Sequence, residues 1–355
     1  MKEATLYLEN SLEFQGYSFG YEYPTDGEVV FDTSMVGYPE NLTDPSYSGQ
    51  IICITFPLVG NYGVPENILK DGISTTFESG KIYAKGVIIS DYSFNYSHWS
   101  AVKSLDQWLK EQKVPGIYCV DTREITKILR DTGSMGGSIV PHGFEKPNKY
   151  SNPDISNQVA EVSCTEVLRY GNNNTKKVVL IDCGVKHSIL RALQTKDIEI
   201  IRVPWDYDFT SMDYDGVIIS NGPGNPEHCS ATIANVAKAI KANKAVFGIG
   251  LGHQILALAS GAKVTKLKSG HRGHNQPVKT YGSDRCYITA QNHSYIVENE
   301  SLQDGWNPYF TSLNDGSNEG IIHESKRFFS VQFTPEAAGE AHETEFLYDN
   351  FIKLL

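Results

Sequence analysis

The residues best placed to perform chemistry lie in one stretch, residues 245–258. Its first five residues, 245–249, are apolar or glycine, as a strand covered on both faces of a sheet requires. A glycine turn follows, and the apolar positions after it predict a helix that ends before Gly261. A strand–turn–helix elbow of this kind raises one side chain above the sheet and aims the helix N-terminus at it, which is where a nucleophile would lie. The elbow residue here is Gly250, so this sequence has an elbow without a nucleophilic side chain.

Three further segments could contribute groups to the same site. The loop 221–226 holds two glycines around a proline, and glycines let backbone N–H groups approach a ligand closely enough to form an oxyanion hole. Taken alone, such a loop is more often a plain turn. Residues 290–295 contain His293, which by itself is more often a packed histidine than a catalyst. Residues 328–337 are typical of a strand followed by a turn.

The elements that must position these groups are strands and helices that alternate from Lys177 onward. This alternation predicts a parallel sheet with helices on both faces, and ligands then bind beyond the carboxyl ends of the strands. Both the loop 221–226 and the Gly250 elbow leave the sheet at those ends. The predicted strands cover 178–182, 198–203, 216–220 and 245–249, and a helix covers 188–194.

Residues 1–150 predict a separate, β-rich domain. A turn and strand at 27–32 and a β run at 50–56 are separated by Gly- and Pro-rich turns. Helices are expected over 105–112 and after the capping residue Asp121. Residues 151–176, with Pro153 and the polar run 171–175, predict a surface linker, and residues 177–355 form the second domain.

Composition excludes several classes of function. The chain has 355 residues and a net charge of −11 without any Lys/Arg cluster, so we expect no nucleic-acid or membrane partner. Its six cysteines are scattered without a CxxC pair, and we therefore expect neither a metal site nor a disulfide framework. No signal-peptide core opens the sequence and no run reaches transmembrane length, which predicts a cytoplasmic protein.

Taken together, these stretches resemble class I glutamine amidotransferases, and the whole chain resembles the carbamoyl phosphate synthetase small-subunit family. In the first domain the resemblance lies in residues 27–31, 37–40, 43–47 and 120–123, and other amidotransferases lack this domain. Residues 272–277 and 318–321 resemble the eukaryotic multifunctional branch, in which the small-subunit part is fused to synthetase domains.

The resemblance implies an α/β fold of two domains. The first is β-rich and mixed, and the second is an amidotransferase-like domain with a mostly parallel sheet flanked by helices. It implies no cofactor, and it makes a carbamoyl phosphate synthetase large subunit the candidate partner, docked through the first domain.

The resemblance also assigns site residues. In the family a cysteine on the elbow attacks the side-chain amide of glutamine, forming a thioester and releasing ammonia. A histidine activates the cysteine, and a glutamate two residues later orients the histidine. These positions fall on Gly250, Thr334 and Glu336, so two of the three groups are missing. The family's glutamine contacts fall on Ser46, Gly222, Gly224, Leu251, Gln254, Asn292, Ser294 and Tyr295.

These substitutions have physical consequences. Covalent catalysis needs a nucleophile beside the amide carbon, and Gly250 supplies none. The Thr334 hydroxyl does not titrate near neutral pH, and losing general-base help costs about 10²–10⁴-fold in rate. Cys229 is a conceivable replacement nucleophile, although a thiol at such a position is usually just packed. Ser294 stands where the family usually has glycine, so its hydroxymethyl group is expected in the pocket wall. Glycine at 250 is also what an elbow with positive φ favours in the absence of chemistry.

Three functions remain open at this point. The first is a small-subunit homologue that has lost glutamine hydrolysis and acts as a structural, regulatory or repurposed protein. The second is an active glutaminase subunit that supplies ammonia for carbamoyl phosphate synthesis. The third is a module that binds glutamine or a similar small ligand, weakly because of Ser294.

Overall fold

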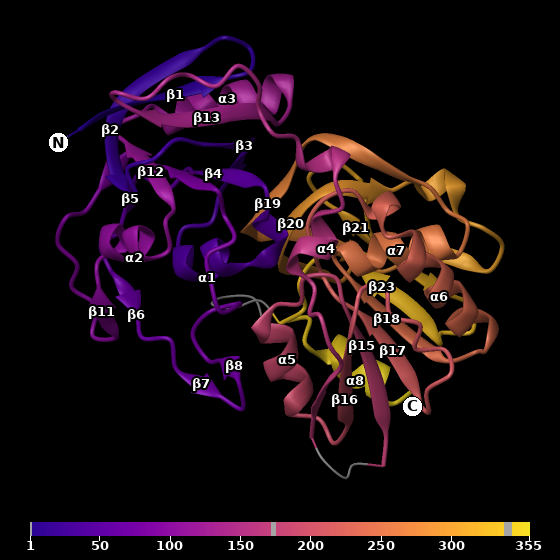
Figure 1. Cartoon of the computed structure of the whole chain (residues 1–355). Coiled ribbons are helices and arrows are strands. Elements are labelled where there is room, and N and C mark those ends of the chain that lie inside the picture. Colours follow the sequence, from indigo (N-terminus) through magenta and orange to yellow (C-terminus); the bar gives the residue numbers. More distant parts are fainter. Residues whose placement is uncertain (1, 172–174, 337–342) are drawn as a thin grey trace. The chain divides into compact units, whose positions relative to one another are not determined.

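The first unit of the chain, Met1–Ser156, is built around a closed barrel of seven strands (Figure 1). The computed structural model describes residues 2–171, 175–336 and 343–355. Side chains alternate along β1 (Glu3–Leu8), where Leu6 and Leu8 are buried and Tyr7 between them is partly exposed. The predicted β-rich, mixed fold of this unit is confirmed. Around the ring the strands are β1 (Glu3–Leu8), β13 (Met135–Pro141), β3 (Thr25–Asp32), β4 (Gln50–Ile54), β9 (Gly86–Ile88), β12 (Pro115–Tyr118) and β2 (Glu13–Gly20).

Short helices and strands surround the barrel. Asp121 caps the helix α3 (Thr122–Thr132) as predicted, because its carboxylate accepts a hydrogen bond from the Glu124 N–H at 2.8 Å. Ser104 caps α2 (Leu105–Glu111) in the same way. The remaining elements are α1 (Tyr38–Thr43), η1 (Pro45–Tyr47), η2 (Pro153–Ile155) and the strand pairs β5 (Leu58–Val59) with β10 (Asp91–Tyr92), β6 (Val64–Pro65) with β11 (Ala101–Lys103), and β7 (Leu69–Lys70) with β8 (Ile73–Ser74).

The second unit, Asn157–Leu355, is an α/β unit with one ten-stranded sheet. Five strands in its middle run parallel, and all five are strands that the sequence predicts. Beyond β23 (Phe328–Val331), antiparallel strands extend the sheet, and three of their four pairs join strands that are consecutive in the chain. In spatial order the strands are β14 (Leu168–Tyr170), β16 (Glu199–Pro204), β15 (Lys177–Asp182), β17 (Gly216–Ile219), β18 (Ala245–Ile249), β23 (Phe328–Val331), β22 (Asn318–His323), β21 (Trp306–Ser312), β19 (Val264–Thr280) and β20 (Cys286–Val297).

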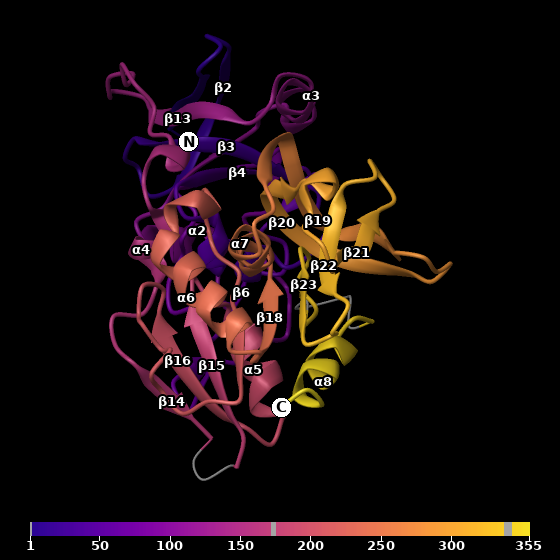
Figure 2. The same cartoon turned by 90° about the vertical axis from the view of Figure 1, so that its right-hand side faces the viewer.

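Helices cover both faces of the parallel strands, as the fold class requires (Figure 2). On β18, Val246 belongs to the apolar core formed with α6 (Ser230–Lys241) and α7 (Leu251–Ala259). Its neighbour Phe247 points to the opposite face and packs against Tyr348 and Phe351 of α8 (Phe346–Ile352). Among the described residues, no helix is long and apolar enough to cross a membrane. The other helices are α4 (Gln158–Val162), α5 (His187–Gln194), η3 (Pro226–His228) and η4 (Asn299–Ser301).

Part of the segment that we expected to be a surface linker, 151–176, has regular structure. Val159 and Val162 of α4 are buried, and β14 pairs with β16 through the Leu168–Arg202 register. The segment is therefore a part of the second unit's core and sheet edge from Asn157 onward. Residues 172–174 of the predicted polar run lie outside the described residues.

A buried ion pair anchors the carboxyl end of β15. Asp182, with no exposed side-chain surface, accepts hydrogen bonds from Arg202 Nε at 2.9 Å and Nη2 at 2.6 Å. The other carboxylate oxygen accepts the N–H groups of Gly184 and Val185 at 2.9 and 2.8 Å. The carboxylate thus fixes the loop that leaves β15 at the edge where ligands bind.

We predict that Asp182→Ala lowers the free energy of unfolding by about 3–5 kcal/mol, because it leaves the Arg202 charge buried without its partner. Urea unfolding followed by circular dichroism measures this loss. The matched control is Asp213→Ala, which removes a pair with Lys177 whose Asp213 side chain is 89% exposed. That change should leave the urea midpoint nearly unchanged, and equal effects of the two substitutions would contradict the prediction.

Candidate functional site

The elbow between β18 and α7 has the backbone of a nucleophile position. Gly250 adopts φ 59° and ψ −113° and forms the N-cap of α7. Its N–H donates to the Val331 carbonyl of β23 at 2.9 Å, and its carbonyl accepts the His253 N–H at 3.1 Å. Only glycine adopts such a positive φ without cost, and other residues there store about 1–3 kcal/mol of strain.

Space around the elbow distinguishes Gly250 from its neighbouring glycines. A Cβ added at Gly248, Gly252 or Gly222 would overlap backbone atoms of packed neighbours. At Gly250 the nearest atoms would be Cβ and Cα of Asn221, at 3.2 and 3.4 Å. The neighbouring glycines are therefore required by close packing, whereas the elbow position could take a Cβ if Asn221 shifted by a few tenths of an ångström, at the cost of a strained backbone.

The two other triad positions lie next to a buried lysine. Thr334 donates its N–H to the Ala290 carbonyl at 3.0 Å, and its hydroxyl accepts from Lys186 Nζ at 3.4 Å. The same ammonium lies 3.9 Å from Glu336 Oε1, and the Glu336 carboxylate also accepts from Ser188 and Tyr348. An ammonium only donates hydrogen bonds. Lys186 therefore gives the glutamate an ionic partner but provides no base.

Three of the predicted glutamine contacts of the second unit, Gly222, Leu251 and Gln254, lie beside this elbow. Gly222 packs against the Cys183 carbonyl, and Leu251 opens α7 directly after the elbow. Gln254 donates from Nε2 to the Tyr295 carbonyl at 3.0 Å and to Gln332 Oε1 at 3.1 Å. Gly224, at the end of the same loop as Gly222, has φ 79°.

Several buried polar atoms near the elbow have no hydrogen-bond partner among the described residues. They are Gln254 Oε1, Gln332 Nε2 and Asn292 Nδ2. An unpaired buried polar group costs about 1–3 kcal/mol. Such a group of donors and acceptors fits a site for a polar ligand, with an amide or carboxylate to complete these hydrogen bonds.

Ser294 makes a contact that the sequence did not predict. Its hydroxyl accepts a short hydrogen bond from Arg272 Nη2 of β19, and Arg272 is only 3% exposed. The hydroxyl is therefore engaged with the sheet and helps to satisfy a buried guanidinium. Ser46 belongs to the first unit, in η1, where its N–H donates to Asp44 Oδ1 at 2.8 Å.

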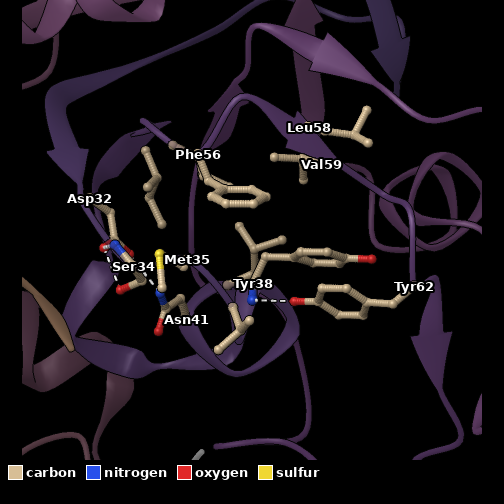
Figure 3. Close-up of a pocket in the computed structure, with 13 residues that line it drawn as sticks. Asp32, Ser34, Met35, Tyr38, Asn41, Phe56, Leu58, Val59 and Tyr62 are labelled. Carbon is tan, nitrogen blue, oxygen red and sulfur yellow. Dashed lines mark hydrogen bonds between the residues drawn. The ribbon is translucent and has the colours of Figure 1, made fainter. Parts of the chain in front are cut away.

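The first unit contains a separate small cavity (Figure 3). It has a volume of about 20 Å³, which is room for one water molecule. Tyr62 closes it by stacking on Tyr38 at 4.3 Å and by accepting the Tyr38 N–H at 3.1 Å. Asp32 at its other end already accepts from Ser34 and Asn41. We interpret this cavity as a packing feature.

Comparison with known proteins agrees with this arrangement. Residues 179–354 match the family model "Glutamine amidotransferase class-I", and residues 6–139 match "Carbamoyl-phosphate synthase small chain, CPSase domain". The chain belongs to the carbamoyl-phosphate synthase small-chain family. The resemblance read from the sequence is thus confirmed for both domains.

The curated relatives of this small-chain protein are much longer. Multifunctional protein CAD of Squalus acanthias is 48% identical over 99% of this chain, which is 16% of that protein. Human carbamoyl-phosphate synthase (ammonia), mitochondrial, is 46% identical over 99% of this chain and 24% of its own length. The chain therefore spans between about a sixth and a quarter of these relatives. A solved structure, a glutamine amidotransferase from Thermotoga maritima, is 18% identical and covers 46% of this chain and 78% of its own, with a TM-score of 0.39.

Cys229 does not have the properties of a replacement nucleophile in this small-chain fold. It is fully buried, and burial raises the pKa of its thiol to about 12. Burial likewise raises the pKa of Cys183, at the end of β15, well above its usual value. Both sulfurs stay protonated at neutral pH, and a thiol is a poor nucleophile.

Sequence reasoning missed Lys186, Ser188 and Tyr348, which contact the Glu336 carboxylate. The place of Lys186 could have been predicted, because this residue follows β15 at the same sheet edge as the elbow. Tyr348 was not, since it comes from a helix in the last residues of the chain.

We predict that iodoacetamide labels native protein at Cys119 and Cys286, the two exposed cysteines. Cys183 and Cys229 should remain unmodified at pH 7.5, because both are buried and protonated. Peptide mass spectrometry measures the labelled positions, and labelling in denaturant, where all six cysteines should react, is the control. Rapid native labelling of Cys229 would contradict this assignment.

Proposed function

We propose that this chain is a carbamoyl-phosphate synthase small-chain homologue whose amidotransferase domain no longer hydrolyses glutamine. The observation that carries the proposal is the Gly250 elbow, which keeps the strained backbone and the space for a side chain but has no nucleophile. The domain would then serve as a structural or regulatory part of carbamoyl phosphate synthesis.

The acid–base half of the site supports the same conclusion. Thr334 has no titrating group for proton transfer at neutral pH, and Lys186 forms an ion pair with Glu336. Loss of one member of such a triad already removes most of its catalytic effect, so the second loss adds little. A partial or slow glutaminase is therefore not expected.

We predict that the purified protein releases no ammonia from glutamine above a heat-inactivated sample. Gly250→Cys with Thr334→His should restore a measurable thioester, because the elbow has room for a Cβ and Glu336 follows two residues after the new imidazole. Mass spectrometry of the acid-quenched protein with glutamine detects this adduct. The matched control is Gly250→Ala with Thr334→His, which has the same backbone strain and no sulfur.

The outcomes of this experiment test both the loss of glutamine hydrolysis and the predicted glutamine contacts. Glutamine turnover by the unmodified protein would contradict the proposal. Ser294→Gly can be added to enlarge the pocket, at the cost of one acceptor for the buried Arg272. If the restored variants fold but calorimetry shows no glutamine binding, the pocket has a different ligand and the predicted glutamine contacts are wrong.

The partner proposed for the chain is a carbamoyl phosphate synthetase. The support for this partner is that 99% of the chain matches a multifunctional protein and also a synthase whose name specifies ammonia. In such an assembly a small-chain domain without glutaminase would accompany a synthetase that takes ammonia from solution.

We predict that the chain co-elutes with a synthetase large subunit from the same source at micromolar concentration during size-exclusion chromatography. The complex should form carbamoyl phosphate from ammonia and should not use glutamine. The isolated second unit, Asn157–Leu355, is the comparison sample if it folds by circular dichroism. Separate elution of the full chain would instead favour a freestanding protein.

A further inference from the structure

A cluster of ionisable side chains lies on the antiparallel strands of the second unit. His271 of β19, His293 of β20 and Glu319 of β22 each place one ligand atom so that all three atoms lie within 4.8 Å of one another. His293 and Glu319 are buried, and the His271 side chain is 14% exposed. The two rings meet edge to face at 4.9 Å, in a pair set by the strand register.

Hydrogen bonds at the periphery fix which nitrogen of each ring faces inward. His293 Nδ1 lies 3.0 Å from the Tyr295 carbonyl, which only accepts, so Nδ1 carries the proton. His271 Nε2 lies 3.0 Å from the Asp315 carboxylate, so that nitrogen carries its ring's proton. His293 Nε2 and His271 Nδ1 therefore direct their lone pairs toward the centre.

With His271 neutral, the inward atoms are all hydrogen-bond acceptors; a proton on His271 Nδ1 would instead be donated to Glu319. Glu319 Oε1 lies 3.4 Å from His271 Nδ1 and 3.7 Å from His293 Nε2. Gln291 Oε1 lies 3.2 Å from His293 Nε2, and this amide is held in place because its Nε2 donates to Glu319 Oε2 and Thr289 Oγ1. Lone pairs that converge without a donor require a cation between them, either a proton or a metal ion.

We propose that His271, His293 and Glu319 bind one divalent transition-metal ion, for which zinc is the best match. Zinc bonds of about 2.0–2.2 Å in tetrahedral geometry separate ligand atoms by roughly 3.3–3.6 Å, close to the separations from Glu319. Two imidazoles and one carboxylate are a known zinc ligand set, and they do not suit calcium or magnesium, which prefer oxygen ligands. Gln291 Oε1 or a water molecule would take the fourth position.

The surrounding hydrogen bonds fit a metal centre. A ligating histidine commonly donates its second N–H to a carboxylate or a backbone carbonyl, which orients the ring. Asp315 provides this contact for His271, the Tyr295 carbonyl provides it for His293, and Gln291 holds the carboxylate.

The ion would join β22 to the consecutive strands β19 and β20. It would also lie next to the elbow site, because Asn292 and Ser294 flank His293 on β20 and point to the opposite face. The site is therefore structural: it would hold in position the strand that carries these two predicted glutamine contacts. The proposal does not depend on whether the elbow is catalytic.

The test is a metal titration of untagged, full-length protein after treatment with a chelator and dialysis. Calorimetry with zinc chloride should give one ion per chain, and zinc should raise the unfolding temperature by mass action. Cobalt(II) in place of zinc should give visible absorption bands typical of a four-coordinate site. Glu319→Gln, which keeps the side-chain shape, should weaken binding by more than about 100-fold.

Two further variants make the result decisive. Asp315→Asn, at a side chain 40% exposed, should fold and weaken zinc binding by about 10–100-fold through the orientation of His271. The control is His323→Asn, at a histidine of β22 that lies outside the cluster and contacts Ser325. This change should leave zinc binding unchanged. Absence of stoichiometric zinc binding would overturn the proposal. Zinc binding by the Asp315→Asn and Glu319→Gln variants that is as tight as in the unmodified protein would do the same. Either result would identify a cluster held together by protons alone.

Discussion

The backbone of the elbow at Gly250 is the constraint on which the rest of the second unit depends. Its position is fixed from three sides: by the hydrogen bond to Val331, by the close approach of Gly248 to Gly252, and by the packing of Gly222 against the β15 loop. None of these contacts involves a side chain at position 250. The geometry of the elbow therefore does not depend on a nucleophile at position 250.

This separation of scaffold from chemistry explains the mixed character of the site. Groups that are held by the fold, such as the glycine loop and Gln254, keep their places because they also pack the core. Groups that act only in proton transfer have no such second role, and Thr334 stands at the position that the family resemblance assigns to one of them. The Glu336 carboxylate remains buried, and Lys186, Ser188 and Tyr348 stabilise its charge. A buried carboxylate needs such partners whether or not the enzyme is active.

Local patterns predicted the parts of the fold that depend on local physics. The five parallel strands, the glycine turn before α7 and the Asp121 cap follow from apolar runs, backbone freedom and side-chain capping. Closure of the barrel did not follow, because pairing of β1 with β13 joins residues more than 120 positions apart. The expectation of a linker over 151–176 was wrong for a similar reason, because only the pairing with β16 shows that β14, a part of this segment, is a strand. The contacts of Glu336 and the His271–His293–Glu319 cluster also arise from long-range pairing, which no spacing in the sequence reveals.

Strand β20 links the histidine cluster to the predicted glutamine pocket. Successive residues of a strand face opposite sides, so Gln291 and His293 belong to the histidine cluster while Asn292 and Ser294 belong to the predicted glutamine pocket. The Tyr295 carbonyl is shared, since it accepts from Gln254 on one side and from His293 on the other. A cation at the cluster would fix the tautomer of His293, and hence the hydrogen bond to this carbonyl. The same carbonyl holds Gln254, whose Oε1 is a buried acceptor without a partner among the described residues. The shape of the pocket is thus tied to the sheet behind it by a chain of hydrogen bonds that requires no catalytic residue.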